Sequence, residues 1–343
     1  MLPDYIRGAD KARIDQSFQT IQSALIDPSK RVGFLFGAGM SAAAGMMSSR
    51  DLGLKFVDAI LPGAGDNLTD TDRDSLLDRY PFESIASAVA KVGNKDREVL
   101  VDILEDAFLF DGEPPEHLDL SVHREFARLV GLHNVADIFT TNFDKLLETS
   151  LGERAFTATQ NTVISPRSST IPIFHLHGLI EDDTYKITED DIYAEKHHYA
   201  INAYKAALYA CDVFVFVGYS MNDPDFRNAY LATQQEYRSR DQLAHKTTYF
   251  VMPIDTEEEY VLASSIWESR NAILLPMVSG DFFTRLKKGL GSETQARLRE
   301  IIMKVKGIDN ETLDELVSEL KEILSVEDNE TALRVLHDEL ESR

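Results

Sequence analysis

The sequence predicts an α/β fold: a Rossmann-like, mostly parallel, doubly wound sheet with an inserted helical module and a helical C-terminal extension. Three observations support this prediction. Short continuous apolar runs recur along the chain, helical patterns separate most of them, and polar or glycine-containing clusters follow four of them. Continuous apolar strands that alternate with helices are typical of a parallel sheet covered on both faces, because such strands are buried on both sides.

The N-terminal region is predicted to be a helix, because its apolar residues recur at helical spacing until Asp27-Pro28 ends the pattern. These apolar residues are Ile14, Phe18, Ile21 and Leu25. Short apolar runs predict the strands that follow. They cover residues 31–36, 136–140, 171–176, 212–217, 248–252 and 272–275.

Two other regions carry helical patterns without convincing strands. Between about 52 and 132, stretches such as 82–92 and 98–109 are helical, which predicts a helical module inserted after the first strand and helix. The C-terminal part is again helical and becomes markedly acidic. We therefore expect one domain over residues 1–283, including this module, followed by an acidic helical extension over residues 284–343.

The extension carries two apolar stripes at helical spacing. They consist of Leu313, Leu316, Val317, Leu320 and Leu324, and of Leu333, Leu336 and Leu340. Amphipathic terminal helices usually pack on their own domain, and contact with a second copy or a partner is the alternative.

Charge and cysteine content exclude several classes of protein. The formal net charge of the 343 residues is −23, from 35 Lys and Arg against 58 Asp and Glu. So acidic a chain repels a phosphate backbone, and direct binding of nucleic acid is not expected. The single cysteine, Cys211, allows neither an intrachain disulfide nor a cysteine-rich zinc site. We expect a cytoplasmic protein without a membrane segment, because its apolar runs are too short to span a bilayer.

The first cluster, G-A-G-M-S at residues 37–41, follows the first predicted strand and precedes a helix, with Gly45 further on. Glycines there let the backbone approach a pyrophosphate, and the start of a helix offers free N–H groups. Ala42 stands where the usual dinucleotide fingerprint has its third glycine. A tight turn into a core helix is therefore an equally good interpretation of this cluster alone.

The second and third clusters place polar side chains at the ends of the next strands. The second, T-T-N-F-D at residues 140–144, combines several polar groups, whereas capping of the helix at 145–150 needs only Asn142 or Asp144. The third cluster is H-L-H-G at residues 175–178. Period-two alternation along the strand predicts that His175 and His177 share one face, with His177 nearer the strand end. His177 can then act as a general base or be a satisfied core histidine. A metal site that adds His197 or His198 has no support from ligand spacing.

The fourth cluster, G-Y-S-M-N-D-P-D at residues 218–225, follows the most apolar strand. Gly218 permits a close backbone approach, and Pro224 fits the first turn of a helix that Asp223 caps. Four such clusters, each at the end of a buried strand, predict one shared crevice at the carboxyl edge of the sheet.

In this order the clusters resemble the sirtuin superfamily, and more closely its prokaryotic sirtuin-like branch of antiphage defence, over residues 32–252. The sirtuin phosphate loop reads G-A-G-x-S-x-x-x-G with an arginine five residues later. It is matched by Gly37, Ala38, Gly39, Ser41, Gly45 and Arg50. The T-Q-N-I-D, H-G and G-T-S motifs of the family are matched by Thr140, Asn142, Asp144, His177, Gly178, Gly218 and Ser220.

The sequence also departs from the protein deacylases of this superfamily. Their four-cysteine zinc module lies between the H-G and G-T-S motifs, where this chain has only Cys211. Their Pro-Asp-Phe before the arginine is replaced here by Met-Ser-Ser at residues 47–49. Both changes remove parts that the family uses on acyl-lysine peptides. The resemblance therefore implies hydrolysis of NAD⁺ to ADP-ribose and nicotinamide, with no metal.

The resemblance implies roles for individual residues. Asn142 would orient a water molecule and the ribose hydroxyls, and His177 would accept a proton, because an ordinary histidine pKa of about 6.5 suits neutral pH. Asp144 would lie near the carboxamide, and Arg50 would hold the nicotinamide-side ribose. The remaining matched residues would bind the phosphates and the adenosine ribose: Gly37, Ala38, Gly39, Ser41, Gly45, Thr140, Gly218 and Ser220.

The resemblance also implies a biological setting: an antiviral effector that depletes NAD⁺ and is activated through assembly. A homo-oligomer is expected, with a HerA-like ATPase as the first candidate partner and a short Argonaute or a phage protein as the next. Three other functions remain as alternatives. They are a non-catalytic NAD⁺-binding regulatory subunit, which would not need both Asn142 and His177, an ADP-ribosyltransferase and a deacylase.

Overall fold

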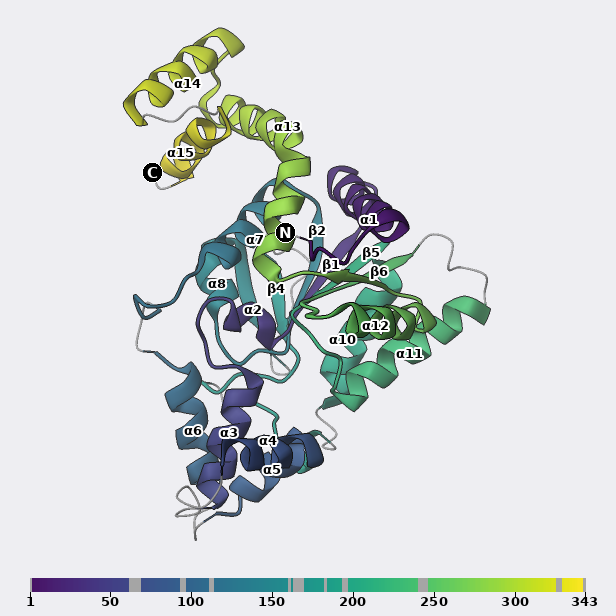
Figure 1. Cartoon of the computed structure of the whole chain (residues 1–343). Helices are drawn as coiled ribbons and strands as arrows, with labels where there is room; N and C mark the ends of the chain where they lie inside the picture. Colours follow the sequence, from purple (N-terminus) through teal and green to yellow (C-terminus); the bar gives the residue numbers. More distant parts are fainter. Residues whose placement is uncertain are drawn as a thin grey trace.

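Seven parallel strands form one sheet at the centre of the computed structural model (Figure 1). Their bounds are β1 Val32–Phe36, β2 Val135–Thr140, β3 Ala155–Ala158, β4 Ile171–His175, β5 Val213–Val217, β6 Thr247–Met252 and β7 Ile273–Pro276. The structure describes residues 2–61, 69–92, 97–110, 114–159, 162, 170–181, 184–192, 197–239, 246–324 and 329–341.

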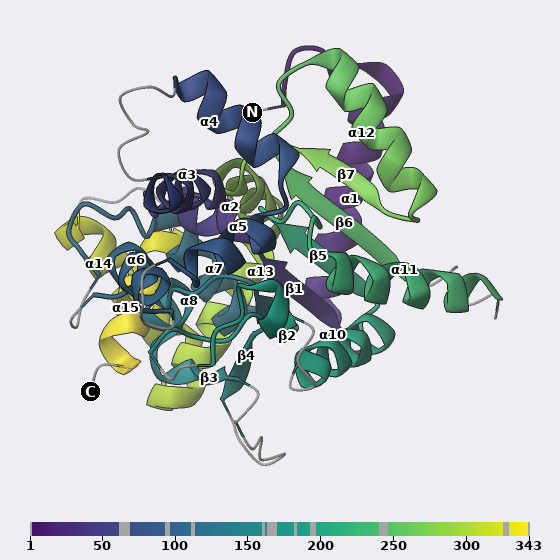
Figure 2. The ribbon, with the colours of Figure 1, turned by 90° about the horizontal axis from the view of Figure 1, so that it is seen from below.

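The strand order is β3-β4-β2-β1-β5-β6-β7, and each neighbouring pair is parallel (Figure 2). This confirms the predicted fold class. The six predicted strands are all present, and the sequence analysis missed only β3. That edge strand, A-F-T-A, has four residues of which only Ala158 is fully buried, so it lacks the continuous apolar run that marks the others. Its pairing with β4, rather than its own composition, holds it in the sheet.

The point at which the order of the strands reverses lies between β1 and β5. From β1 the chain continues to β2 and β4 on one side, whereas β5, β6 and β7 extend the sheet on the other side. In open α/β sheets the crevice at the carboxyl ends of such neighbouring strands is where ligands bind. The first and fourth sequence clusters begin at these two strand ends.

Aromatic packing shows that helices cover both faces of the sheet. The ring of Phe36 on β1 lies 4.6 Å from that of Phe126, and 6.4 Å from that of Phe283. The ring of Phe216 on β5 lies 5.8 Å from that of Tyr230. Because Phe36 is paired with Val217, it and Phe216 point to opposite faces of the sheet. The helices on the first face include α1 Gly8–Ile26, α7 Ser121–Leu132 and α13 Ser279–Lys306, and those on the second include α10 His197–Ala210 and α11 Pro224–Ser239 (Figure 2).

A helical module follows the first strand and the short helix α2 Ala38–Ala42, and lies below the sheet in Figure 1. Its helices are α3 Ser49–Ile60, α4 Asp70–Arg79, α5 Phe82–Val89 and α6 Glu98–Phe108. They enclose a second apolar core that contains Leu52, Phe56, Ile85, Val89, Leu100 and Leu104. The segment at 184–192, which ends in α9 Glu189–Ile192, adds Tyr185 and Ile187 to this core. Phe126 of α7, by contrast, packs on the sheet, although α7 lies within the span at which a module was expected.

The remaining helices connect strands or form the C-terminal extension. They are α8 Leu146–Leu151, the 3₁₀ turn η2 Gly152–Arg154, α12 Glu257–Ser269, α14 Asn310–Leu324 and α15 Asn329–Glu341. Helix α13 starts on the sheet with Phe282 and Phe283 buried, and continues away from it to carry α14 and α15 (Figure 1). The expected domain boundary at 283 therefore falls inside one helix.

A third apolar core holds the extension together. It consists of Leu298, Ile302, Leu313, Val317, Ala332 and Leu333. The predicted apolar stripes of the last two helices thus pack mainly against α13 and against each other, with Leu320, Leu336 and Leu340 partly buried beside them. The side chain of Leu324 is outside the described residues. Among the helices that the structure describes, none is both long and apolar enough to cross a bilayer.

Candidate functional site

A cavity of about 280 Å³ opens between the carboxyl edge of the sheet and the helical module. This volume is near the lower end of the roughly 300–1,000 Å³ that is typical of small-molecule sites. Its walls combine the ends of β1, β2, β4 and β5 with apolar side chains of the module. The lining residues are Ala38, Gly39, Ser41, Met47, Ser49, Leu52, Phe82, Glu83, Phe108, Thr141, Asn142, Phe143, Asp144, His177, Lys186, Ile187, Ile192, Gly218, Tyr219 and Ser220.

At the point where the strand order reverses, the first and fourth clusters touch backbone to backbone. A Cβ atom on Gly39 would lie 2.8 Å from Gly218 Cα, and one on Gly37 would lie 2.5 Å from the carbonyl oxygen of Gly218. Gly218 itself has a φ of +63°, which side chains disfavour. The glycines are thus required for this approach of two loops, whatever binds beside them.

This region also engages backbone N–H groups that the phosphate-loop motif was expected to present to a phosphate. The N–H of Gly37 donates to the carbonyl of Val217, and the N–H of Gly39 donates to that of Gly218, both at 3.0 Å. The amide of Met40 donates to Gly37 at 2.9 Å. The first turn of α2 therefore offers a ligand fewer free N–H groups than the motif alone implies.

Asn142 is held from three sides at the end of β2. Its Nδ2 donates to the carbonyl of Gly37 at 3.1 Å and to Ser41 Oγ at 2.8 Å, and its backbone N–H donates to Thr140 Oγ1 at 3.0 Å. Both side-chain N–H groups are therefore engaged. The side-chain oxygen Oδ1 is the part of the amide that stays available to a ligand in the cavity.

Asp144 anchors the other end of this network. Ser41 Oγ donates to Asp144 Oδ2 at 2.6 Å, and the N–H of Leu146 donates to Oδ1 at 3.1 Å. Burial raises the pKa of Asp144, although the two hydrogen bonds act in the opposite direction. The carboxylate thus ties α2 to the start of α8, and its contact with Leu146 is the capping interaction that the sequence left open.

His177 lies beyond the end of β4, with Nε2 at 3.3 Å from Asp223 Oδ2. Asp223 also caps α11, because its Oδ1 accepts from the N–H groups of Asp225 and Phe226 at 2.8 and 3.2 Å, as the sequence predicts. Burial lowers the pKa of His177, although the nearby carboxylate of Asp223 acts in the opposite direction. The imidazole is therefore neutral at pH 7 and able to accept a proton.

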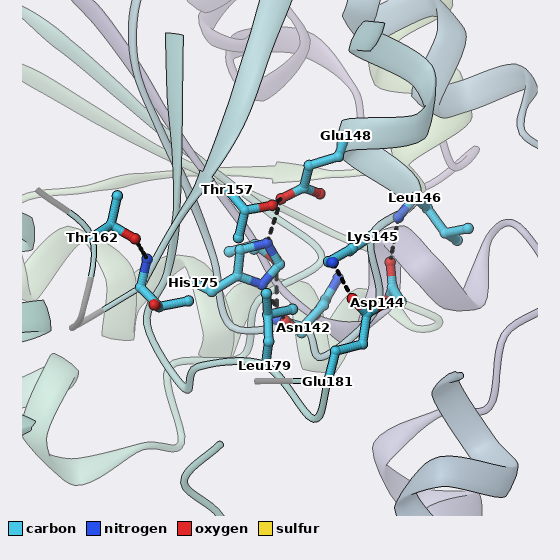
Figure 3. Close-up of polar contacts among 12 residues, drawn as sticks. Asn142, Asp144, Lys145, Leu146, Glu148, Thr157, Thr162, His175, Leu179 and Glu181 are labelled. Atoms are coloured by element: carbon cyan, nitrogen blue, oxygen red, sulfur yellow. Dashed lines mark hydrogen bonds and ion pairs between the residues drawn. The ribbon is translucent and has the colours of Figure 1, made fainter. Parts of the chain in front are cut away.

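His175 has a different environment, because β4 ends at this residue and the strand alternation does not continue to His177. Its Nε2 lies 2.7 Å from Glu148 Oε1, and its Nδ1 lies 3.1 Å from the carbonyl oxygen of Asn142 (Figure 3). The expectation of two histidines on one strand face is therefore wrong. Both ring nitrogens of His175 have protein partners, which leaves none for a metal, and the side chains of His197 and His198 are outside the described residues.

Eight of the twelve residues that the sequence analysis proposed line this cavity. They are Ala38, Gly39, Ser41, Asn142, Asp144, His177, Gly218 and Ser220. Two more, Gly37 and Thr140, lie behind Asn142 and accept hydrogen bonds from it.

The last two proposed residues lie elsewhere. Gly45 forms the turn after α2 with a φ of +96°. Arg50 lies on α3, where its guanidinium is 2.6 Å from Asp74 Oδ1, and it is not among the lining residues.

Sequence reasoning missed Lys186, a residue of the cavity wall, and two residues that lie beside the wall, Asp223 and Glu148. Asp223 was interpreted only as a helix cap, and Glu148 and Lys186 were not singled out. Lys186 is 7% exposed and is the positively charged side chain among the described lining residues. The D-P pair within the fourth cluster was the available signal for Asp223, whereas the contacts of Glu148 and Lys186 depend on the fold.

Comparison with known proteins identifies one region of the chain. Residues 136–273 match the family described as a SIR2-like domain. This span runs from β2 to the start of β7 and contains Asn142, His177 and Gly218. No curated protein matches the chain.

Three solved structures of Sir2 proteins are similar to this chain at low sequence identity. A Sir2 homologue in complex with NAD has 17% sequence identity and a TM-score of 0.48, over 82% of this chain and 94% of that chain. A variant Sir2 homologue in complex with ADP-ribose has 16% identity and a TM-score of 0.45, over 81% and 97%. A further Sir2 enzyme structure has 13% identity and a TM-score of 0.42, over 84% and 99%.

Proposed function

We propose that this chain is an NAD⁺ hydrolase, which converts NAD⁺ and water into ADP-ribose, nicotinamide and a proton. The observation that carries the proposal is the presence of Asn142 and His177 on the wall of one cavity, within the region that matches a SIR2-like domain. A binding site alone would not need a free amide oxygen together with a buried neutral imidazole. The resemblance to sirtuin-like proteins supplies NAD⁺ as the ligand.

The leaving group of the proposed reaction does not require a general acid. Nicotinamide departs as a neutral pyridine when its bond to C1′ of the ribose breaks, so that it requires no proton. Positive charge develops on the ribose, and the oxygen of a water molecule then bonds to C1′ while its proton leaves. A protein accelerates such a step by excluding bulk water and by fixing one water molecule in line with C1′. The apolar module side chains Leu52, Phe82 and Phe108 would exclude bulk water.

Asn142 would orient the attacking water. Because its two N–H groups are held by Gly37 and Ser41, its Oδ1 faces a ligand as an acceptor only. An acceptor can fix the direction of a water O–H or of a ribose hydroxyl. Its partial negative charge also favours the developing positive charge of the ribose.

His177 would take the proton from that water. Burial keeps its imidazole neutral, and Asp223 beside Nε2 would stabilise the imidazolium that forms. The proton is released to solvent afterwards, which balances the reaction. Lys186, whose backbone N–H donates to the carbonyl of His177 at 2.7 Å, would bring positive charge to the phosphates. Gly218 and Ser220 would contact the adenosine side.

The decisive test is incubation of the purified protein with NAD⁺ and analysis of the products by mass spectrometry. We expect ADP-ribose and nicotinamide, and loss of turnover in Asn142→Ala and in His177→Ala with unchanged circular dichroism. Wild-type turnover in His177→Ala would remove the base from the scheme. O-acyl-ADP-ribose from an acetylated peptide would indicate a deacylase, and binding without turnover would indicate a regulatory subunit.

We further propose that the enzyme acts as an antiviral effector that depletes NAD⁺ once it is assembled. The resemblance to antiphage sirtuin-like proteins supports the effector role. Activation on assembly follows because constant NAD⁺ depletion would kill the host cell. The partner would be a second copy or a HerA-like ATPase, with a short Argonaute or a phage protein as further candidates. Turnover measured over a range of protein concentrations, together with the size of the assembly, tests it. Turnover per chain that is independent of concentration and of partner would contradict activation by assembly.

A further inference from the structure

Behind Asn142 lies a buried pair of titratable side chains that the proposed chemistry does not use. His175, at the end of β4, has a fully buried side chain, and Glu148, on α8, is 15% exposed. His175 Nε2 and Glu148 Oε1 are 2.7 Å apart, and Thr157 on β3 donates its hydroxyl to the same Oε1 at 3.0 Å (Figure 3). Three elements that are distant in sequence thus meet at one carboxylate.

The partners of His175 determine how many protons its ring carries. The carbonyl oxygen of Asn142 can only accept, so Nδ1 must bear a hydrogen and donate to it. The carboxylate of Glu148 also accepts, so Nε2 must bear a hydrogen too, which makes the ring an imidazolium. Burial alone would lower the pKa of His175 and raise that of Glu148. Burial is the largest single influence on each pKa, but attraction between the two charges and the hydrogen bonds together outweigh it and shift each pKa in the opposite direction.

The other groups around His175 agree with this charge state. Asp144, in the loop before α8, is the second acidic group that favours its protonated form. From β3 the facing group is the neutral hydroxyl of Thr157. Lys145 and Glu181 lie nearby and form an ion pair with each other (Figure 3).

Asn142 is the residue that this pair holds. Its backbone N–H, its carbonyl and both side-chain N–H groups take part in hydrogen bonds with Thr140, His175, Gly37 and Ser41. The bond from His175 is the one that fixes its carbonyl and hence the orientation of the peptide plane after Asn142. A rotation of that plane would change the direction in which Oδ1 faces the cavity.

We propose that His175 and Glu148 form a charged positioning pair, which clamps the backbone of Asn142 and so aims its side-chain oxygen at the ligand. This inference rests on the proposed function for its effect on turnover, but not for its effect on Asn142. Neither His175 nor Glu148 is among the residues that line the cavity, so the pair would act through Asn142.

Turnover of NAD⁺ by two variants tests the clamp. His175→Ala removes the donor to Asn142, and we expect kcat to fall about 10- to 10²-fold, as misplacement of an orienting group by about 1 Å does. KM should stay within about threefold, because the groups that bind the dinucleotide are untouched. In Glu148→Gln a neutral His175 can still donate from Nδ1 and accept from the new amide, so kcat should stay within about threefold of wild type. Equal losses in both variants, or an unchanged kcat in a folded His175→Ala protein, would overturn the clamp.

A matched control separates positioning from loss of stability. His123 on α7 is also a buried histidine, 1% exposed, and does not line the cavity. His123→Gln can therefore change the melting temperature, but kcat should stay within about twofold of wild type. A similar loss of kcat in this control would show that any buried histidine substitution impairs turnover, and would overturn the specific role of His175.

Nitrogen-15 NMR of histidine-labelled protein tests the pair without NAD⁺ turnover. The wild-type protein should show His175 with both ring nitrogens protonated at pH 7, and the Glu148→Gln variant should show only Nδ1 protonated. A neutral His175 ring in the wild type at pH 7 would overturn the charged pair. In uniformly nitrogen-15-labelled protein, the side-chain amide signals of Asn142 should move in His175→Ala but stay close to wild type in Glu148→Gln. If the wild type turns over no NAD⁺, the proposed function fails while these spectra still decide the inference.

Discussion

Two polar regions flank Asn142, and they differ in how their buried groups are satisfied. Behind Asn142, His175 and Thr157 meet Glu148 through hydrogen bonds. Toward the cavity, His177 and Asp223 only approach each other. Among the described residues, four buried polar atoms there lack hydrogen-bond partners, namely His177 Nδ1, Asp223 Oδ2, Tyr204 Oη and Tyr219 Oη, whereas behind Asn142 the corresponding atom is Glu148 Oε2. Buried polar atoms are nearly always paired in folded proteins, so the second region offers more unpaired groups to a ligand than the first.

The two histidines show that the surrounding groups, and not the position in the sequence, determine the protonation state and role of an imidazole. His175 and His177 are two residues apart in one motif. Acceptors on both sides make the first an imidazolium, whereas burial beside a single carboxylate at 3.3 Å keeps the second neutral. The first holds the structure, and the second is available for proton transfer.

The largest expected effect distinguishes the two carboxylates. Asp223→Asn should keep the cap of α11, because Asn is an equally good N-cap residue, but it removes the charge that would stabilise a protonated His177. We expect kcat to fall about 10²-fold, against a change of a few fold for Glu148→Gln. Steady-state kinetics of both variants at pH 7.5 measures the difference. Equal effects would show that the two regions do not differ in role.

The pH dependence of turnover sharpens the same comparison. Because burial lowers the pKa of His177, kcat/KM should fall only when the pH drops below about 6.5, the ordinary value, and then by about tenfold per pH unit. The charge of Asp223 raises this pKa, so Asp223→Asn should move the fall to still lower pH. A fall that begins above pH 7 in the wild type would assign the titration to another group.

Gly39→Ala tests whether the cavity side depends on the contact between the two loops. The new Cβ would lie 2.8 Å from Gly218 Cα, so the loops must separate. We expect a loss of about 1–3 kcal/mol in the free energy of unfolding, as for overpacked sites, measured by urea denaturation. Weaker NAD⁺ binding should accompany it. Gly280→Ala is a suitable control, because the nearest side-chain atom, of Val122, is 3.5 Å away.

His123 provides an unsatisfied buried histidine that does not line the cavity. Neither ring nitrogen has a hydrogen-bond partner among the described residues, and burial lowers its pKa to about 4. Since the unfolded chain takes up a proton near pH 6.5 and the folded chain does not, stability is lost as the pH falls from 6.5 towards 4. His123→Leu should therefore raise the melting temperature by a few °C, and more at pH 5 than at pH 8. An increase that is independent of pH would contradict this assignment.

The smallest effect is expected for Arg50. Its ion pair with Asp74 is on the surface of the module, and such pairs contribute about 0–1 kcal/mol. Arg50→Ala should change turnover by less than about twofold and leave the melting temperature nearly unchanged. A tenfold loss of turnover would instead support the ribose contact that the resemblance implies.

The sequence predicted the fold class and six strands, because continuous apolar runs report burial on both faces directly. It did not reveal β3, since Ala155 and its neighbours join the sheet through β4 and not through an apolar run. The shared cavity also followed from the order of the clusters, because parallel strands bring their carboxyl ends to one edge.

The roles of single side chains were harder to predict. Glu148 has the appearance of an ordinary helix residue until α8 brings it against His175, a contact between residues 27 positions apart. The function of Asp223 as a partner of His177 was hidden behind its more obvious use as a cap. Such assignments need the three-dimensional arrangement, because one residue type serves several purposes.

The contact between Gly39 and Gly218 also determines when the crevice can form during synthesis of the chain. The two glycines come from opposite halves of the polypeptide, so a nascent chain on the ribosome cannot complete this corner until β5 has emerged and docked beside β1. Pairings of such long sequence separation form slowly. An unfinished N-terminal fragment therefore lacks the amino acids that close the crevice, and the complete site exists only once most of the chain has been synthesised.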